Sequence, residues 1–196
     1  SFFPVIQEIA DKIKNGEKSF KNKKFALDLG AGNGWASFIL LKNGFITDTI
    51  DKDSFKIAHM NEHLKHWEKK FSGKTNIIKA DIVGYPLPIN HYQLVIVLNL
   101  FHLLSEDEQK IVADKILKSL KRGGYLIASI LTPDSPKKPE KFNSGLKLED
   151  FKKLFKKLKI VSAETFLSDR GQHINLLTAF KPLGFWQRLL QRFLYN

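Results

Sequence analysis

Three glycines and one carboxylate stand close together near the start of the chain, in a pattern that can bind a ligand against the backbone. Gly30, Gly32 and Gly34 follow the apolar run 25–29, and apolar residues at helical spacing resume at Trp35. This order predicts a strand, a tight turn and a helix. Glycine permits backbone conformations closed to other residues and lets a ligand lie directly against the chain. We therefore predict a binding loop over residues 28–34.

The carboxylate of Asp28 narrows the choice of ligand. A dinucleotide loop with the spacing G-x-G-x-x-G would have its third glycine where Trp35 stands, but here the third glycine is one position earlier. A dinucleotide also needs the helix N-terminus for its pyrophosphate. A carboxylate two residues before the first glycine instead suits a ligand with a cationic amine and no phosphate, such as S-adenosylmethionine.

Further polar groups follow the next predicted strands. Asp51 ends the second strand, where one carboxylate can accept hydrogen bonds from two ribose hydroxyls. Asp81 and Ile82 follow the third strand and offer a carboxylate acceptor for an adenine amino group and a backbone donor for a ring nitrogen. Open α/β sheets bind ligands outside the carboxyl ends of their strands, so we expect these groups and Asn99 to lie at the same edge as Gly30.

Taken together, these segments resemble the class I S-adenosylmethionine-dependent methyltransferases. Residues 28–34 are similar to the first motif of that family, 50–53 to its ribose-binding segment, 79–82 to its adenine-binding segment, and 120–126 to the segment leading into its fifth strand. The resemblance covers about residues 25–182 and implies S-adenosylmethionine as cofactor, with no metal assigned. The residues that it places at the cofactor are Asp28, Gly30, Ala31, Gly32, Asn33, Asp51, Lys52, Asp81, Ile82, Leu98 and Asn99.

Within this class, residues 99–104, the proline-bearing loop 132–142 and residues 171–173 are similar to the TehB-type small-molecule methyltransferases. This finer resemblance implies a small-molecule acceptor, such as a thiol or a chalcogen oxyanion. A cationic side chain can hold a soft anionic acceptor without a strong base, so Arg170, His173 and His102 are the candidate catalytic residues. No Asn/Asp-Pro-Pro-Tyr/Phe stretch follows the fourth strand, which argues against the amino-methylating enzymes that share it. The absence of cysteine excludes C5 methylation of pyrimidines through a cysteine nucleophile.

The elements that must position these residues alternate along the chain. Helices are expected at 4–13, 35–42, 53–70, 105–120 and 146–158, and strands at 25–29, 45–50, 75–79, 92–98, 125–131, 160–166 and 173–180. Residues 121–124, two basic residues and two glycines, are expected to stop the fourth of these helices. The sum predicts one α/β domain over residues 1–182. Its Rossmann-like sheet has seven strands, mostly parallel with an antiparallel last strand, and helices on both faces.

Composition sets the remaining limits. Of the 196 residues 43% are hydrophobic, enough for a sizeable core, and none is cysteine. No apolar run reaches the roughly 20 residues of a membrane span, so we expect a cytoplasmic protein. The net charge of +12 suggests nucleic acid, but the lysines alternate with apolar residues along helix faces such as 151–158. His59, His63 and His66 share a metal-binding spacing, which we discount because an exposed lysine-rich helix offers no second shell of carboxylates.

Residues 183–196 predict a C-terminal amphipathic helix, with apolar side chains on one stripe and glutamine and arginine opposite. It could pack on its own domain, join a second subunit in a homodimer, or lie in a membrane interface. Two alternatives to a small-molecule enzyme therefore stay open. One is an RNA or protein methyltransferase that uses its basic surface, and the other is a non-catalytic cofactor-binding module that docks a partner through this tail.

Overall fold

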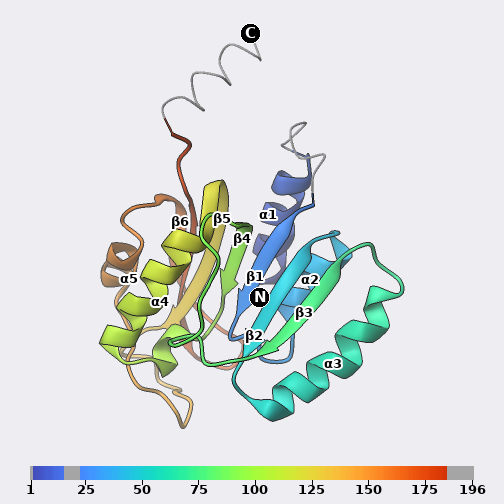
Figure 1. Cartoon of the computed structure of the whole chain (residues 1–196). Coiled ribbons are helices and arrows are strands. Elements are labelled where there is room, and N and C mark those ends of the chain that lie inside the picture. The colour runs from blue at the N-terminus through green and yellow to red at the C-terminus, as the bar shows by residue number, and fades with distance from the viewer. Residues whose placement is uncertain (1, 16–22, 185–196) are drawn as a thin grey trace.

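A computed structural model of the protein describes residues 2–15 and 23–184, and within them one seven-stranded sheet has the order β3-β2-β1-β4-β5-β7-β6 (Figure 1). The parallel part comprises β1 (Phe25–Leu29), β2 (Ile46–Asp51), β3 (Lys74–Lys79), β4 (Tyr92–Val97) and β5 (Leu120–Leu131). β7 (His173–Phe180) runs antiparallel to both β5 and β6 (Lys159–Leu167). The predicted Rossmann-like sheet with an antiparallel end is confirmed.

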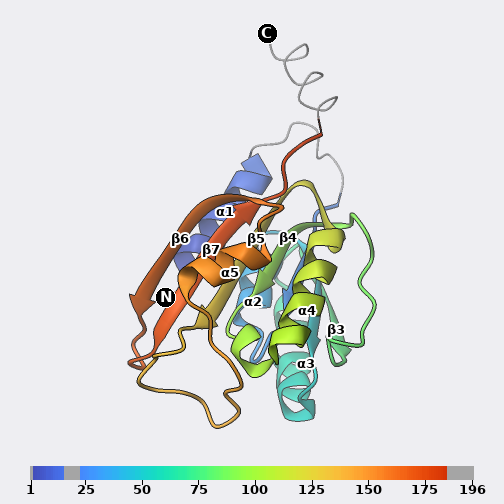
Figure 2. The ribbon, with the colours of Figure 1, turned by 90° about the vertical axis from the view of Figure 1, so that its left-hand side faces the viewer.

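Helices cover both faces of the sheet (Figures 1 and 2). One apolar cluster joins α1 (Phe3–Asn15) and α2 (Trp35–Lys42) to one face, and a second joins α4 (Glu106–Ser119) and α5 (Leu148–Leu154) to the other. α3 (Ser54–Glu68) packs against α2 and β3. Successive strand residues point to opposite faces, so Ala26 belongs to the first cluster while Leu27 and Leu29 belong to the second.

Side-chain caps fix where two helices begin. The Asp53 carboxylate accepts hydrogen bonds from the N–H groups of Phe55 (2.9 Å) and Lys56 (3.2 Å) at the start of α3. At the start of α4, the Glu108 N–H donates to the Ser105 hydroxyl (3.3 Å) and the Ser105 N–H donates to the Glu108 carboxylate (2.8 Å). Ser105 and Glu108 stand at the spacing of a capping box in the sequence, and this reciprocal pair shows that the box forms.

Three expectations about the elements were wrong. Residues 121–124 do not end a helix, because α4 ends at Ser119 and β5 begins at Leu120, which pairs with Tyr92 before a register shift. Sheet pairing outweighs the local glycine signal there. α5 is shorter than 146–158, and Phe155 and Leu158 are buried beyond its end. The sequence also places Ile57, Met60, Leu64, Trp67 and Phe71 at the spacing of one buried stripe along the expected third helix, but only Met60 and Leu64 are buried.

The C-terminal amphipathic helix of the sequence prediction lies almost wholly outside the described residues. Within the residues that are described, no helix has the length and apolar character needed to cross a membrane.

Candidate active site

The glycine loop lies at the carboxyl edge of the sheet, where the strand order reverses between β1 and β4. The N–H groups of Gly30 and Ala31 both donate to the Ile50 carbonyl, at 2.8 and 3.1 Å, and the Gly34 N–H donates to the Ala31 carbonyl at 2.9 Å. These bonds fold the loop against the end of β2. Crevices at such a reversal are where open α/β sheets bind ligands.

Asp51 fixes the outer part of this loop. Its carboxylate accepts hydrogen bonds from the Gly32 N–H (2.8 Å) and the Asp53 N–H (2.9 Å), and the side chain is only 8% exposed. Gly32 has a φ of +58°, and a Cβ built there would stand in open space, with its nearest neighbour the Gly30 carbonyl at 4.0 Å. The loop therefore forms a cradle that a side chain at position 32 would fill.

Asp28 lies beneath the loop rather than at its surface. The carboxylate is 3% exposed and accepts hydrogen bonds from the Ser37 N–H (3.0 Å) and the Ser37 hydroxyl (2.6 Å), and that hydroxyl also bonds Thr49 (2.8 Å). The carboxylate thus satisfies one of the open donors in the first turn of α2. Sequence reasoning missed Ser37, although a small polar residue within an otherwise apolar helix was a usable signal.

Burial raises the pKa of Asp28 to about 6, against about 3.9 in an unfolded chain. The folded protein therefore binds this proton more tightly than the unfolded chain does. The contribution of Asp28 to the free energy of unfolding is fully present below about pH 4 and is lost as the pH rises through 6. The loss corresponds to roughly 3 kcal/mol. Asp28→Asn, whose amide oxygen can still accept from Ser37, should remove this slope and raise the free energy of unfolding at pH 8 by about 1–2 kcal/mol. Urea unfolding of the parent and the variant at pH 5 and pH 8 measures this pH dependence of the free energy of unfolding. The same pH dependence in both proteins would contradict the prediction.

The groups expected at the far end of the cofactor also lie at this edge. One oxygen of Asp81 accepts from the Val83 N–H (3.0 Å), and the other pairs with the Lys52 ammonium at 3.3 Å. The Val83 N–H and the Lys52 charge hold the pKa of Asp81 below its usual value, so it is ionised at neutral pH. The side chain of Ile82 is buried in the core.

The end of β4 contributes a strained residue. Asn99 has a φ of +55°, its N–H donates to the Ser129 hydroxyl (3.0 Å), and that hydroxyl donates to the Asn99 side-chain oxygen (3.2 Å). Ser129 on β5 therefore holds Asn99 in a backbone region that non-glycine residues seldom occupy. Such strain is common at functional sites.

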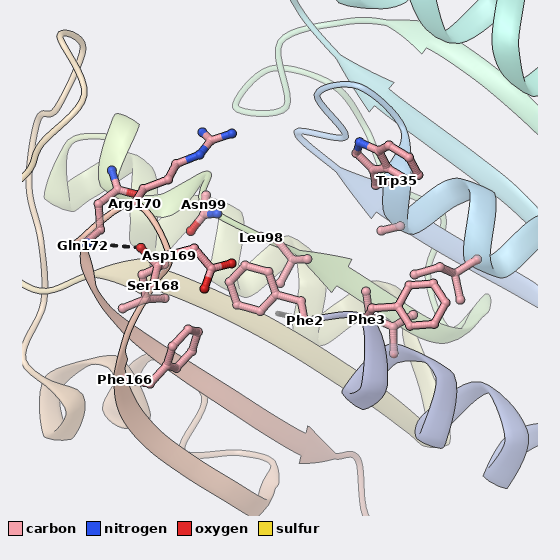
Figure 3. Close-up of a pocket in the computed structure, with 14 residues that line it drawn as sticks. Phe2, Phe3, Trp35, Leu98, Asn99, Phe166, Ser168, Asp169, Arg170 and Gln172 are labelled. Atoms are coloured by element: carbon pink, nitrogen blue, oxygen red, sulfur yellow. Dashed lines mark hydrogen bonds between the residues drawn. The ribbon is translucent and has the colours of Figure 1, made fainter.

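A cavity of about 520 Å³ adjoins the glycine loop (Figure 3). Its walls come from the start of α1, from Trp35 and its neighbours on α2, from Leu98 and Asn99 after β4, and from the turn between β6 and β7. Trp35 is 72% exposed, which is unusual for the largest apolar side chain. The cavity is of the size that small organic ligands occupy.

The three candidate catalytic residues occupy different places. Arg170 lines the cavity from the β6–β7 turn, whereas neither histidine is among the lining residues. His173 is joined to the proline loop, since its N–H donates to the Ser135 hydroxyl (3.1 Å). His102 is buried and stacks on Phe142, and burial lowers its pKa to about 4. At neutral pH His102 is therefore uncharged.

The proline-bearing loop 132–142 follows β5 and is irregular, as expected, and the irregular residues 143–147 connect it to α5. The N–H groups of Asn143 and Ser144 donate to the His102 carbonyl at 2.8 and 3.3 Å, which fixes the loop to the segment after β4. At the start of α3, the Lys56 N–H lowers the pKa of Asp53, and the charge of Lys141 in the loop lowers it further. The loop is thus held against the segment that follows β4.

The histidines of α3 do not converge. The rings of His59 and His63 lie 4.2 Å apart, while His66 packs edge-to-face against Trp67. Among the described residues no group of three or more side chains could hold a metal ion.

S-adenosylmethionine, which the sequence resemblance implies, fits the residues present. An open glycine cradle, a buried carboxylate below it and carboxylates at the ends of β2 and beyond β3 are arranged along one edge. Such a set suits an uncharged nucleoside joined to a cationic amine, because it provides acceptors and offers no cluster of positive charge for a pyrophosphate.

The sequence of the chain matches one protein family and one relative of similar sequence. Residues 26–124, about half of the chain, match the model of the family described as methyltransferase domain. An uncharacterized protein of Methanocaldococcus jannaschii is 31% identical over 169 residues, which cover 84% of this chain and 66% of that protein. The chain thus spans about two thirds of the length of this relative.

Two solved structures share the fold. TehB from Haemophilus influenzae superposes with a TM-score of 0.68 at 18% identity, over 89% of this chain and 61% of that one. The N-methyltransferase NodS from Bradyrhizobium japonicum, solved with S-adenosyl-L-homocysteine, gives a TM-score of 0.68 at 15% identity, over 90% and 87% of the two chains.

Proposed function

Since the chain belongs to the methyltransferase domain family and is a class I enzyme with S-adenosylmethionine as cofactor, we propose that it transfers a methyl group to a small molecule held in the cavity. The observation that carries this proposal is the position of the cavity. Its wall includes Trp35, the first residue after the glycine loop, and Asn99, at the end of the neighbouring strand. A molecule in the cavity is therefore adjacent to the cofactor site.

We assign the cofactor contacts to the loop and the strand ends. Asp51 is assigned to the ribose hydroxyls, and Asp81 and the Ile82 N–H are assigned to the adenine. Asp28 and the cradle around Gly32 are assigned to the amino-acid group. Lys52, which pairs with Asp81, orients that carboxylate. Gly30, Ala31, Asn33, Leu98 and Asn99 complete the expected contacts. When bound, the cofactor supplies a methyl group that its sulfonium has already made electrophilic.

The size and lining of the cavity favour one of the two expected acceptor classes. About 520 Å³ is far more than an inorganic oxyanion needs, and the walls include phenylalanine, isoleucine and leucine. An oxyanion loses strong hydration in such surroundings. We therefore propose an organic acceptor, with a thiol as the reacting group.

Arg170 is the residue that we propose to act on this thiol. Its guanidinium makes no ion pair with another described residue and lines the cavity. A fixed positive charge stabilises the thiolate over the thiol and orients it. Once an acceptor is bound, the aromatic rings of the cavity replace part of the water around the nucleophile.

Arg170→Gln tests this role. We expect kcat for methyl transfer to an aromatic thiol to fall about tenfold, because one cationic contact to the nucleophile is lost. The affinity for S-adenosylhomocysteine, measured by calorimetry, should change less than twofold. Arg122→Gln is the matched control, since Arg122 is an exposed arginine on β5 near Lys181 at the opposite end of the sheet.

A transfer assay with labelled cofactor over thiols, selenite, tellurite and RNA tests the acceptor class. Methylation of RNA with strongly salt-dependent binding would replace the small-molecule proposal by a basic-surface enzyme. Transfer to none of these acceptors, with tight cofactor binding, would favour a non-catalytic module.

A further inference from the structure

The outer end of the cavity is built from aromatic rings. Phe2 and Phe166 meet edge-to-face with their centroids 5.8 Å apart, and Phe3 and Trp35 line the same cavity. Phe3 is 48% and Trp35 72% exposed, so part of this aromatic surface faces solvent. Exposed aromatic faces that converge on one cavity are typical of a ligand site.

A carboxylate is set against these rings. Asp169 lines the cavity, and Figure 3 shows its carboxylate directed toward Phe2. It makes no hydrogen bond or ion pair with any other described residue, and Arg170, its neighbour in sequence, points elsewhere. Asp169 is exposed at this turn, so its charge is accessible to a ligand in the cavity.

The position of Asp169 is fixed by the turn that carries it. The Ser168 N–H donates to the Gln172 carbonyl (2.8 Å), the Gly171 N–H donates to the Ser168 carbonyl (2.8 Å), and the Gln172 N–H donates to the Ser168 hydroxyl (3.1 Å). These three bonds close the β6–β7 turn with Asp169 and Arg170 at its tip. The two charges are thus presented to the cavity by a defined backbone.

Aromatic rings and a carboxylate together recognise one kind of group. The negative faces of the rings attract a cation, most strongly when it is weakly hydrated, and the carboxylate adds a direct charge contact. An anion would be repelled by Asp169, and an uncharged group would gain nothing from it. The chemistry that matches all of these residues is an ammonium group.

We propose that Phe2, Phe166 and Asp169 bind a protonated or quaternary ammonium group of the methyl acceptor. This inference rests on the proposed function, because it names the class of that acceptor. The cationic end lies at Asp169 and the nucleophile at the Arg170 and Asn99 side, which borders the glycine loop (Figure 3). The acceptor is then a small organic molecule with an ammonium at one end and a thiol at the other.

Equilibrium binding tests the ammonium site without methyl transfer. The probes are (4-hydroxyphenyl)trimethylammonium and its uncharged isostere 4-tert-butylphenol, titrated by calorimetry into the full chain with saturating S-adenosylhomocysteine. We expect the ammonium to bind about tenfold more tightly. In an apolar cavity without this site, 4-tert-butylphenol would bind more tightly than the ammonium probe, because removing an uncharged group from water costs less free energy.

Two variants assign the preference to residues. Asp169→Asn should reduce the tenfold ratio to about twofold, and Phe166→Leu should weaken the ammonium about threefold and the isostere little. Glu164→Gln, which removes one exposed carboxylate from the same hairpin outside the cavity, should leave the ratio unchanged. Melting temperatures check that each variant is folded. A ratio near one in the parent, or an equal effect of Asp169→Asn and Glu164→Gln, would overturn the inference.

A second measurement separates this inference from the proposed function. Initial rates are compared for 4-(trimethylammonio)benzenethiol, 4-tert-butylbenzenethiol and 4-mercaptobenzoate, with the cationic thiol expected to have the highest kcat/KM. Equal methylation of all three would support thiol transfer and reject the ammonium site. A tenfold binding ratio without methylation of any thiol would support the site and reject the proposed transfer.

Discussion

Asp51→Asn should weaken the binding of S-adenosylhomocysteine about 100-fold. The carboxylate already accepts from the N–H groups of Gly32 (2.8 Å) and Asp53 (2.9 Å), and in our proposal it also accepts from the ribose. Asparagine replaces one acceptor oxygen by a donor, which must then face a backbone N–H or a ribose hydroxyl. The variant therefore loses a charged contact to the cofactor and part of the support of the loop.

The choice of ligand makes this test specific. 5′-Methylthioadenosine keeps the ribose and adenine of the cofactor but lacks its amino-acid group. Asp51→Asn should weaken both this molecule and S-adenosylhomocysteine, whereas Asp28→Asn should weaken S-adenosylhomocysteine alone. Asp48→Asn is the matched control, because Asp48 lies on the same strand but accepts a hydrogen bond from the Tyr92 hydroxyl (2.6 Å). Affinities within threefold of the parent in Asp51→Asn would contradict the ribose assignment.

The place of the glycine loop and of the strand ends could be predicted from the sequence because their signals are local. The glycines and Asp51 belong to neighbouring strands of a parallel unit, and the loop makes its main contacts with the adjacent strand, through Ile50 and Asp51. The start of α4 could be predicted equally well, since both partners of the capping box lie within four residues of each other in the sequence. Where the deciding contact is near in sequence, residue types and spacing are enough.

The errors arose where distant contacts decide. Residues 121–124 carry a helix-stop pattern, yet the pairing of Leu120 with Tyr92 and the burial of Gly124 draw them into β5. The cavity is the clearest case, because Phe2, Trp35 and Asp169 come from three segments that no sequence pattern connects. Their proximity follows only from the packing of α1 and of the β6–β7 hairpin around the end of β4.

Gly32→Val should abolish measurable binding of S-adenosylhomocysteine, a loss of at least 100-fold, through two effects. The position has a φ of +58°, which costs a β-branched residue of the order of 1–2 kcal/mol. The side chain would also occupy the open space of the cradle, where, apart from the adjacent residues 31 and 33, the Gly30 carbonyl at 4.0 Å is the nearest described atom. Because that space is empty of protein, the substitution blocks the ligand without disturbing the core.

Gly44→Val and Gly84→Val separate these two effects. Gly44 has a φ of +79° at the end of α2, so its substitution carries the backbone strain without the cradle, and Gly84 has no atom within 4 Å of its Cβ position. Unfolding by urea should therefore show a loss of stability in the Gly32 and Gly44 variants and little change in the Gly84 variant. Calorimetry should show lost cofactor binding in the Gly32 variant alone. Strong binding by a folded Gly32→Val protein would place the cofactor elsewhere and would overturn the cradle assignment.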